Sequence, residues 1–238
     1  MRFSLAILTL LAATAASPQE PTPGQAMRQA VDRLLPLLAE PQLAQLRLPF
    51  NDEARLTWSY LPGERRGLVM KGLGEEQQQA VLAVVRTGLS TSGFATVETI
   101  RSLDEVLRRL GQGAHRDSEF YYLACFGEPS DETPWAVRFE GHHVSLNWTI
   151  SDGKVIASTP QFFGANPGEV RDGDHLVGTR ALATEEDLGR SFVQSLNEEQ
   201  RSQAVLEGAA PAEILTRMDP LAERLEDTGI AFGALTPD

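Results

Sequence analysis

The clearest alternation of hydrophobic and polar positions in the chain lies between Trp135 and Ile150. The apolar residues occupy odd positions up to Phe139 and even positions from Val144 onward. A strand places successive side chains on opposite faces, so this change of parity moves the buried face by one residue. We expect a bulge at Gly141, because glycine tolerates a kink at the least cost. The bulged strand would place Arg138, Glu140, His143, Ser145 and Asn147 on one face, and Trp135, Val137, Phe139, His142, Val144, Leu146 and Trp148 on the other.

Further apolar runs and turn residues surround this strand. Strands are predicted over residues 119–126, 155–163 and 176–182, with a short edge strand at Trp58 and Tyr60. The segment Ser151-Asp-Gly-Lys154 has the sequence of a two-residue hairpin turn. Antiparallel strands joined by such turns form a meander.

Apolar residues at helical spacing predict helices on both sides of the strand region. Helices are expected over residues 25–48, with a break or kink at Pro36 and Pro41, and over 74–90, 95–101, 102–110, 184–196, 197–206 and 212–225. The predicted fold is therefore α+β, an antiparallel β-meander flanked by N-terminal and C-terminal helices.

The first residues have the pattern of an export signal. A positive start at Arg2 precedes an apolar run over residues 3–13, and Ala13-Thr-Ala15 has the form of a cleavage site. We expect a signal peptide over residues 1–16, a linker over 17–24 and a single domain over 25–238. No later segment is long and apolar enough to cross a bilayer. The mature protein is expected to be secreted or periplasmic, with no membrane span after cleavage.

Charge and cysteine content narrow the classes of partner. The formal net charge is −12 and the pI is near 4.8, which argues against nucleic acid and anionic membrane surfaces. Cys125 is the only cysteine, so no internal disulfide can form, and its apolar surroundings predict a buried thiol. A small molecule or a peptide is the expected class of ligand.

The polar face of residues 135–150 carries the candidate chemistry. Glu140 and His143 are predicted as metal ligands or as a catalytic acid/base pair, because carboxylate and imidazole groups serve both roles. His142 or His175 would supply a further ligand to a transition metal, zinc or copper, and the protein would then have hydrolytic or redox activity. Ser145 and Asn147 would orient these groups by hydrogen bonds. The alternative is a solvated sheet face without a function.

A second interpretation is a non-catalytic binding protein. Its pocket would hold an anionic or planar ligand between aromatic and arginine side chains, with an amide beside them: Trp58, Tyr60, Arg66, Arg138 and Asn147. A third is a structural domain with a buried polar cluster. The sequence has no nucleophile elbow, P-loop, dinucleotide fingerprint, His-Glu-x-x-His or Cys-x-x-Cys motif. Whether the protein is an enzyme stays open at this stage.

One phrase recurs along the chain. Leu73-Gly-Glu-Glu-Gln77 and Leu196-Asn-Glu-Glu-Gln200 each lead into an Ala-Val-Leu helix. The segment Leu235-Thr-Pro-Asp238 has the start of another helix, with Thr236 as its N-cap and Pro237 at the first helical position. We therefore hypothesise that the domain is incomplete at its C-terminus.

Several phrases over residues 50–238 carry a family resemblance. They are Trp58-x-Tyr60-x-Pro62 with Arg66-Gly67, the helix of Gln77, Leu89-Ser90-x-x-Gly93, Phe126-Gly127-x-Pro129, Trp135, Glu140-Gly-His-His143-x-Ser-Leu-Asn147 and Phe163-Gly-Ala-Asn-Pro167. The Glu140–Asn147 phrase is the most specific of them. On these phrases the chain resembles an exported family catalogued as domain of unknown function 3500. The resemblance implies secretion and a shared fold, and it implies that the domain continues with a helix, strands and a histidine-bearing segment. It implies no established reaction.

Overall fold

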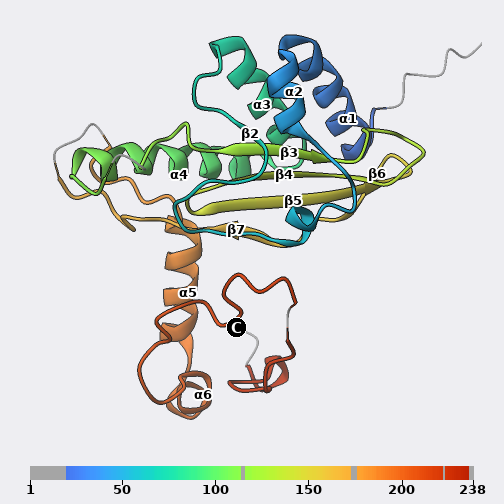
Figure 1. Cartoon of the computed structure of the whole chain (residues 1–238). Coiled ribbons are helices and arrows are strands. Elements are labelled where there is room, and N and C mark those ends of the chain that lie inside the picture. The colour runs from blue at the N-terminus through green and yellow to red at the C-terminus, as the bar shows by residue number, and fades with distance from the viewer. Residues whose placement is uncertain (1–19, 114–115, 173–175, 222, 236–238) are drawn as a thin grey trace, which may run out of the picture.

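The structure is a computed structural model that describes residues 20–113, 116–172, 176–221 and 223–235. Its centre is one mixed, mostly antiparallel sheet (Figure 1). A meander of β3 (Tyr122–Phe126), β4 (Trp135–Gly141), β5 (Val144–Ser151) and β6 (Lys154–Ala157) forms its main part. Beside β3 lie β1 (Arg47–Leu48), which is parallel to it, and β2 (Leu68–Val69); β7 (Gln161–Phe163) pairs with β5. The predicted α+β class and the meander are confirmed.

The change of parity between residues 139 and 144 has a different cause from the predicted bulge. His142 and His143 form a two-residue turn between β4 and β5, with Gly141 opposite Val144 and Phe139 opposite Leu146. Partners across a two-residue turn have opposite parity, so the same face continues from odd to even positions. The bulge at Gly141 is therefore a wrong prediction, and His142 and His143 belong to a turn. The two sets of strand residues do face opposite ways.

Helices cover the apolar face of the sheet (Figure 1). They are α1 (Pro23–Leu34), the short 3₁₀ helix η1 (Leu35–Leu37), α2 (Glu40–Leu46), α3 (Glu75–Thr87) and α4 (Thr91–Arg109). Most of their buried residues form one cluster with Trp135, Phe139 and Trp148 of the sheet, while Leu103 and Val106 of α4 belong to a second one. The approach is close at Gly88, where an added Cβ would lie 2.4 Å from the indole of Trp148. The break near Pro36 is confirmed.

The structure differs from the prediction at two helix starts. The helix α1 begins at Pro23, inside the expected linker, because Thr22 and Gln25 form a capping box. Residues 95–101 and 102–110 were predicted as two helices, but α4 is continuous through them. The hydroxyl of Ser102 donates to the carbonyl of Thr99 inside α4, and Asp104 is buried. Ser102 therefore lies inside a continuous helix, although the sequence around it has the pattern of a helix N-cap.

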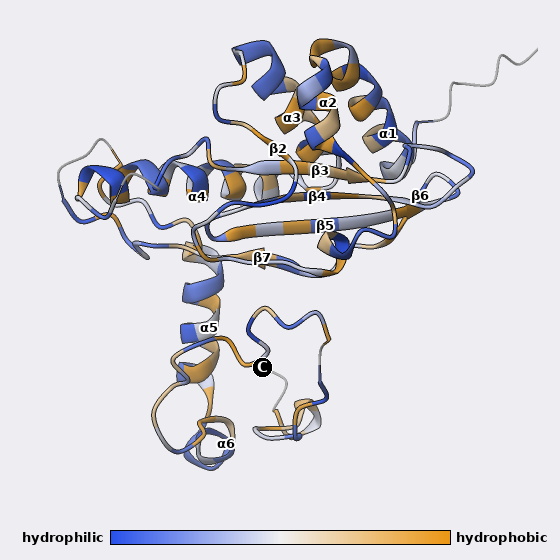
Figure 2. Ribbon diagram, in the orientation of Figure 1, coloured by the Kyte–Doolittle hydropathy of each residue, from blue (hydrophilic) through white to orange (hydrophobic). Residues whose placement is uncertain are grey.

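The C-terminal helices are α5 (Ala183–Ser195) and α6 (Glu198–Ala204), both close to prediction, followed by the short 3₁₀ helix η3 (Phe232–Ala234). They project from the side of the sheet opposite α1 and α3, and exposed apolar residues such as Leu188 and Phe192 lie along α5 (Figures 1 and 2). The recurring motif has the same structural role at both places. The side-chain oxygens of Gln77 and Gln200 each accept the backbone N–H of the residue that caps their own helix.

Four element predictions are wrong. Residues 58–60, 176–182, and the described part of 212–225 form neither strand nor helix, and residues 155–163 contain two short strands in place of one. The irregular C-terminal stretch has a clear physical reason, because residues 212–221 and 223–225 bury no side chain fully and a helix there would have nothing to pack against. Within the described ranges no helix is long and apolar enough to cross a membrane.

Candidate functional site

The polar face of the sheet is covered by the loop of residues 52–67, and Glu140 holds this loop in place. One oxygen of its buried carboxylate lies 2.6 Å from Nε of Arg65. The other accepts hydrogen bonds from the backbone N–H of Ser59, at 3.1 Å, and from the hydroxyl of Ser145, at 2.8 Å. Both carboxylate oxygens of Glu140 are thus engaged.

Arg138, two residues earlier on the same face, fastens the loop at further points. Its guanidinium donates to the backbone carbonyls of Ala54, Thr57 and Arg66, the last two at 2.7 and 3.0 Å. Burial lowers the pKa of Arg138, and Glu140 opposes that shift. Glu140, Arg138 and Arg65 together form what we call the polar clamp. The polar clamp fixes a loop, whose only helix is the short 3₁₀ helix η2 (Glu53–Leu56), onto the sheet.

At the end of β4 the turn of His142 and His143 contains a buried acid–imidazole pair. The carboxylate of Asp104, on α4, lies 2.5 Å from Nδ1 of His142. The hydroxyl of Tyr121 donates to the backbone carbonyl of His142, at 2.6 Å, and to the same carboxylate, at 3.2 Å. The guanidinium of Arg116 contacts both ring nitrogens of His142. A carboxylate accepts and a guanidinium donates, so the contacts of Asp104 with Nδ1 and of Arg116 with Nε2 fit the tautomer with its proton on Nδ1; the approach of Arg116 to Nδ1 is then not a hydrogen bond.

His143 takes a different role in this turn. Its backbone lies in the left-handed region, with φ of 61°, and its ring stacks on that of His142 with centroids 3.8 Å apart. Its N–H donates to the carbonyl of Tyr60 and its own carbonyl accepts from the N–H of Gly164. Desolvation lowers the pKa of His143 to about 4, with smaller contributions from His142 and Arg116. His143 is therefore neutral at physiological pH.

A cavity of about 350 Å³ opens beside His142, and we call it the turn pocket. Pro62, Phe120 and Tyr122 give it apolar and aromatic walls, and the carboxylates of Glu64 and Asp117 border it. Asp117 already pairs with Lys71 at 2.7 Å. The turn pocket can therefore receive a small molecule next to the Asp104–His142 pair.

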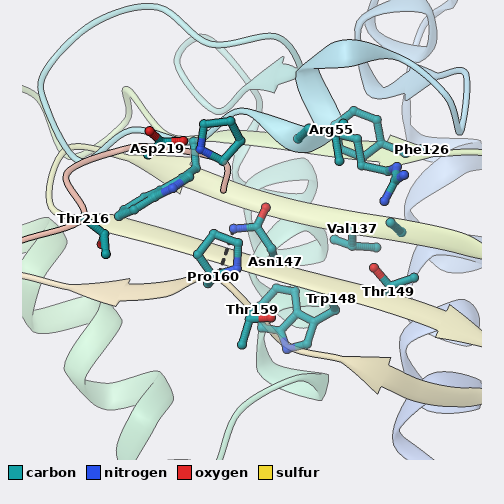
Figure 3. A pocket seen from close by; sticks show the side chains of 14 residues that line it. Arg55, Phe126, Val137, Asn147, Trp148, Thr149, Thr159, Pro160, Thr216 and Asp219 are labelled. Carbon is teal, nitrogen blue, oxygen red and sulfur yellow. Dashed lines mark hydrogen bonds between the residues drawn. The ribbon is translucent and has the colours of Figure 1, made fainter. Parts of the chain in front are cut away.

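A second cavity of about 330 Å³ lies near the other end of β4 and β5, and we call it the strand pocket. Figure 3 shows Asn147 near its centre, hydrogen-bonded through Nδ2 to the carbonyl of Pro160 at 2.9 Å. Trp58 lines the strand pocket from the loop, and Thr216 and Asp219 border it from the irregular C-terminal segment.

The structure separates the residues that the sequence grouped as metal ligands. Glu140 belongs to the polar clamp, while His142 and His143 form the turn, and His175 lies outside the described residues. Over the described ranges no group of three or more His, Cys, Asp or Glu side chains is arranged to hold a metal ion.

The residues predicted to bind a ligand are only partly brought together. Trp58 and Asn147 both line the strand pocket. Tyr60 is buried, stacks on Phe162 with centroids 4.8 Å apart, and donates to Glu213. Arg66 is exposed and pairs with Asp52 away from that pocket.

Sequence reasoning missed the partners that lie far away in the chain. Asp104, Tyr121 and Arg116 around His142 carry no local signal, apart from the misleading capping pattern at Asp104. The predicted burial of Cys125 holds, and burial raises the pKa of its thiol to about 12, which leaves it unreactive.

Comparison with known proteins shows the family and nothing more specific. A family model described as a protein of unknown function, DUF3500, matches residues 20–238, so the chain belongs to this family. No curated protein and no solved structure matches the chain.

Proposed function

We propose that the chain is an exported enzyme in which His142 serves as general base and general acid in hydrolysis of a small molecule. The observation that carries this proposal is the 2.5 Å contact between the buried carboxylate of Asp104 and Nδ1 of His142, at the edge of the turn pocket. A carboxylate in that position fixes the imidazole tautomer and stabilises its protonated form. The pattern of residues 1–16 supports export.

The proposed step uses His142, which lines the turn pocket, and Arg116, which contacts its ring. Once the guanidinium of Arg116 turns from Nε2 of His142 toward the substrate, Nε2 would take a proton from a water molecule as the water oxygen bonds to the acyl carbon of the substrate. The ring would then return that proton to the leaving group as its bond to the acyl carbon breaks. Arg116, beside the ring, would stabilise the negative charge that develops on the acyl oxygen. The walls formed by Phe120 and Tyr122 favour a small ester or amide with an apolar group.

Hydrolysis of a panel of small chromogenic esters and amides tests this proposal. The wild-type chain should hydrolyse at least one of them, and His142→Gln and Asp104→Asn should each lower kcat/KM by about 100-fold or more. Asp52→Asn makes the same chemical change at a carboxylate that pairs with Arg66, and should leave turnover intact. Circular dichroism checks that each variant is folded.

A nuclear magnetic resonance measurement gives a result that does not depend on the substrate. Two-bond proton–nitrogen correlations should show His142 as the Nδ1–H tautomer in the wild type, and this preference should weaken in Asp104→Asn. Turnover that survives in His142→Gln, or an Nε2–H tautomer in the wild type, would overturn the assignment.

Transition-metal binding is a second proposal, favoured by the adjacent rings of His142 and His143. Zinc and copper are the ions to test, because both accept imidazole ligands. Elemental analysis of protein purified without chelator should find about one metal per chain, lost in His143→Asn. No metal, and no thermal stabilisation by added zinc or copper, would reject it. His143→Asn also separates the two proposals, since the acid/base mechanism predicts that its activity is retained.

A further inference from the structure

The strand pocket contains two opposite charges that do not pair with each other. Arg55 and Asp219 lie on opposite sides of Asn147 in Figure 3. Among the residues that the structure describes, neither forms an ion pair. Two uncompensated charges of opposite sign in one cavity match a ligand that carries both signs.

Arg55 is held in place by its surroundings before any ligand binds. Its guanidinium lies over the ring of Phe50, 4.4 Å from the centroid, and Nε donates to the carbonyl of Phe50 at 2.7 Å. Within the described part of the chain its two terminal amino groups have no hydrogen-bond partner. A planar guanidinium with two free donors on one edge suits a carboxylate, which it can bind through two parallel hydrogen bonds.

Asp219 occupies the other side of the cavity, at its exposed mouth. One carboxylate oxygen accepts the backbone N–H of Leu221 at 2.9 Å, which orients the group. Its other oxygen has no partner among the described residues, and it can accept a hydrogen bond from an ammonium group.

Between the charges the pocket offers a polar centre and aromatic walls. Nδ2 of Asn147 donates to Pro160 and Ser145, and this fixes the amide and leaves Oδ1 as an acceptor. Trp58 and Phe126 line the cavity, whereas the indole of Trp148 packs on the other face of the sheet, against Gly88. A backbone amide N–H suits the acceptor, and an apolar side chain suits the walls.

We propose that the strand pocket binds a short peptide with free termini, with its carboxylate on Arg55, its ammonium group on Asp219 and its amide N–H on Oδ1 of Asn147. A dipeptide is the size that a cavity of about 330 Å³ accommodates. This inference is independent of the acid/base proposal, because the turn pocket shares no lining residue with the strand pocket.

Isothermal titration calorimetry with glycylphenylalanine tests the proposal. The free dipeptide should bind, and blocking either terminus, as N-acetyl-glycylphenylalanine or as the C-terminal amide, should weaken binding about tenfold or more. Asp219→Asn keeps the oxygen that accepts from Leu221 and removes only the charge. It should weaken the free dipeptide by a similar factor and leave the N-acetyl form unaffected.

Arg55→Gln gives the complementary result. It should weaken the free dipeptide and leave the affinity of the C-terminal amide unchanged, because that ligand has no carboxylate to lose. Arg66→Gln, a matched change at an arginine outside the pocket, should alter neither. The proposal is overturned if the dipeptide does not bind at millimolar concentration, or if both blocked forms bind as well as the free one. It is also overturned if Asp219→Asn weakens the free and N-acetyl forms equally.

Discussion

The two faces of the sheet are built in different ways. The face under α1 and α3 is closed by side chains such as Trp135, Phe139 and Trp148, which pack into one continuous apolar cluster. The opposite face is closed by the polar clamp, in which Glu140 and Arg138 bind a loop through backbone groups. The apolar face gains stability from buried area, whereas the polar face fixes the position of a loop and leaves cavities at both ends of it.

The largest expected effect tests the apolar face. Trp135→Ala removes a fully buried indole and should lower the free energy of unfolding by about 3–5 kcal/mol. Denaturant unfolding followed by circular dichroism measures the change. A loss below about 1 kcal/mol would mean that this face is not the main source of stability.

The next effect tests the polar clamp. Glu140→Ala leaves the largely buried guanidinium of Arg65 without its carboxylate, and should cost about 3 kcal/mol of unfolding free energy. Proteolysis should then cut the chain within residues 52–67 earlier than in the wild type. Ser145→Ala removes only one hydrogen bond to Glu140 and should cost about 1 kcal/mol. Wild-type stability in Glu140→Ala would contradict the clamp.

A pH titration tests the turn at the end of the polar face. The pKa of His143 in the folded chain is about 4, below its ordinary value of 6.5. Between these two pH values the unfolded chain therefore binds a proton at His143 that the folded chain does not. This contribution to stability is complete above pH 6.5 and is lost as the pH falls toward 4, by at most about 1.4 kcal/mol per pH unit. His143→Asn should remove this part of the slope, because asparagine tolerates the positive φ and has no titratable group. An unchanged slope in the variant would assign it to other groups.

The smallest expected change in the free energy of unfolding is at Arg66, whose side chain lies outside the polar clamp. Arg66 is exposed and pairs with Asp52 only at the surface, so Arg66→Gln should change the unfolding free energy by less than about 0.5 kcal/mol. Its thermal unfolding midpoint should match that of the wild type within error. A large loss would mean that the side chain of Arg66 is part of the clamp, beyond the backbone carbonyl that Arg138 binds.

The same contrast explains what could be predicted from the sequence. Period-two alternation identified the residues of the apolar face and those of the polar face, because every strand residue must point one way or the other. It could not distinguish a bulge from a two-residue turn at His142 and His143, since both change the parity.

The residues that contact the polar face could not be predicted from the sequence, for a different reason. Asp104 meets His142 across 38 residues of sequence, and Ser59 meets Glu140 across 81. No periodicity links such distant positions, and only the folded topology brings them together. The sequence therefore pointed to the turn and strand residues on which the proposed site is built, but it did not predict the distant residues that contact them.

The loop of residues 52–67 connects the strand pocket and the turn pocket. Arg55 and Trp58 of this loop line the strand pocket, and Pro62 and Glu64 line the turn pocket. Between them, Arg138 and Glu140 bind backbone groups of the loop. One continuous segment of backbone thus joins the two cavities. If a ligand shifted this segment from one end, affinity at the other end would change, and thermodynamic linkage would make the change equal in both directions.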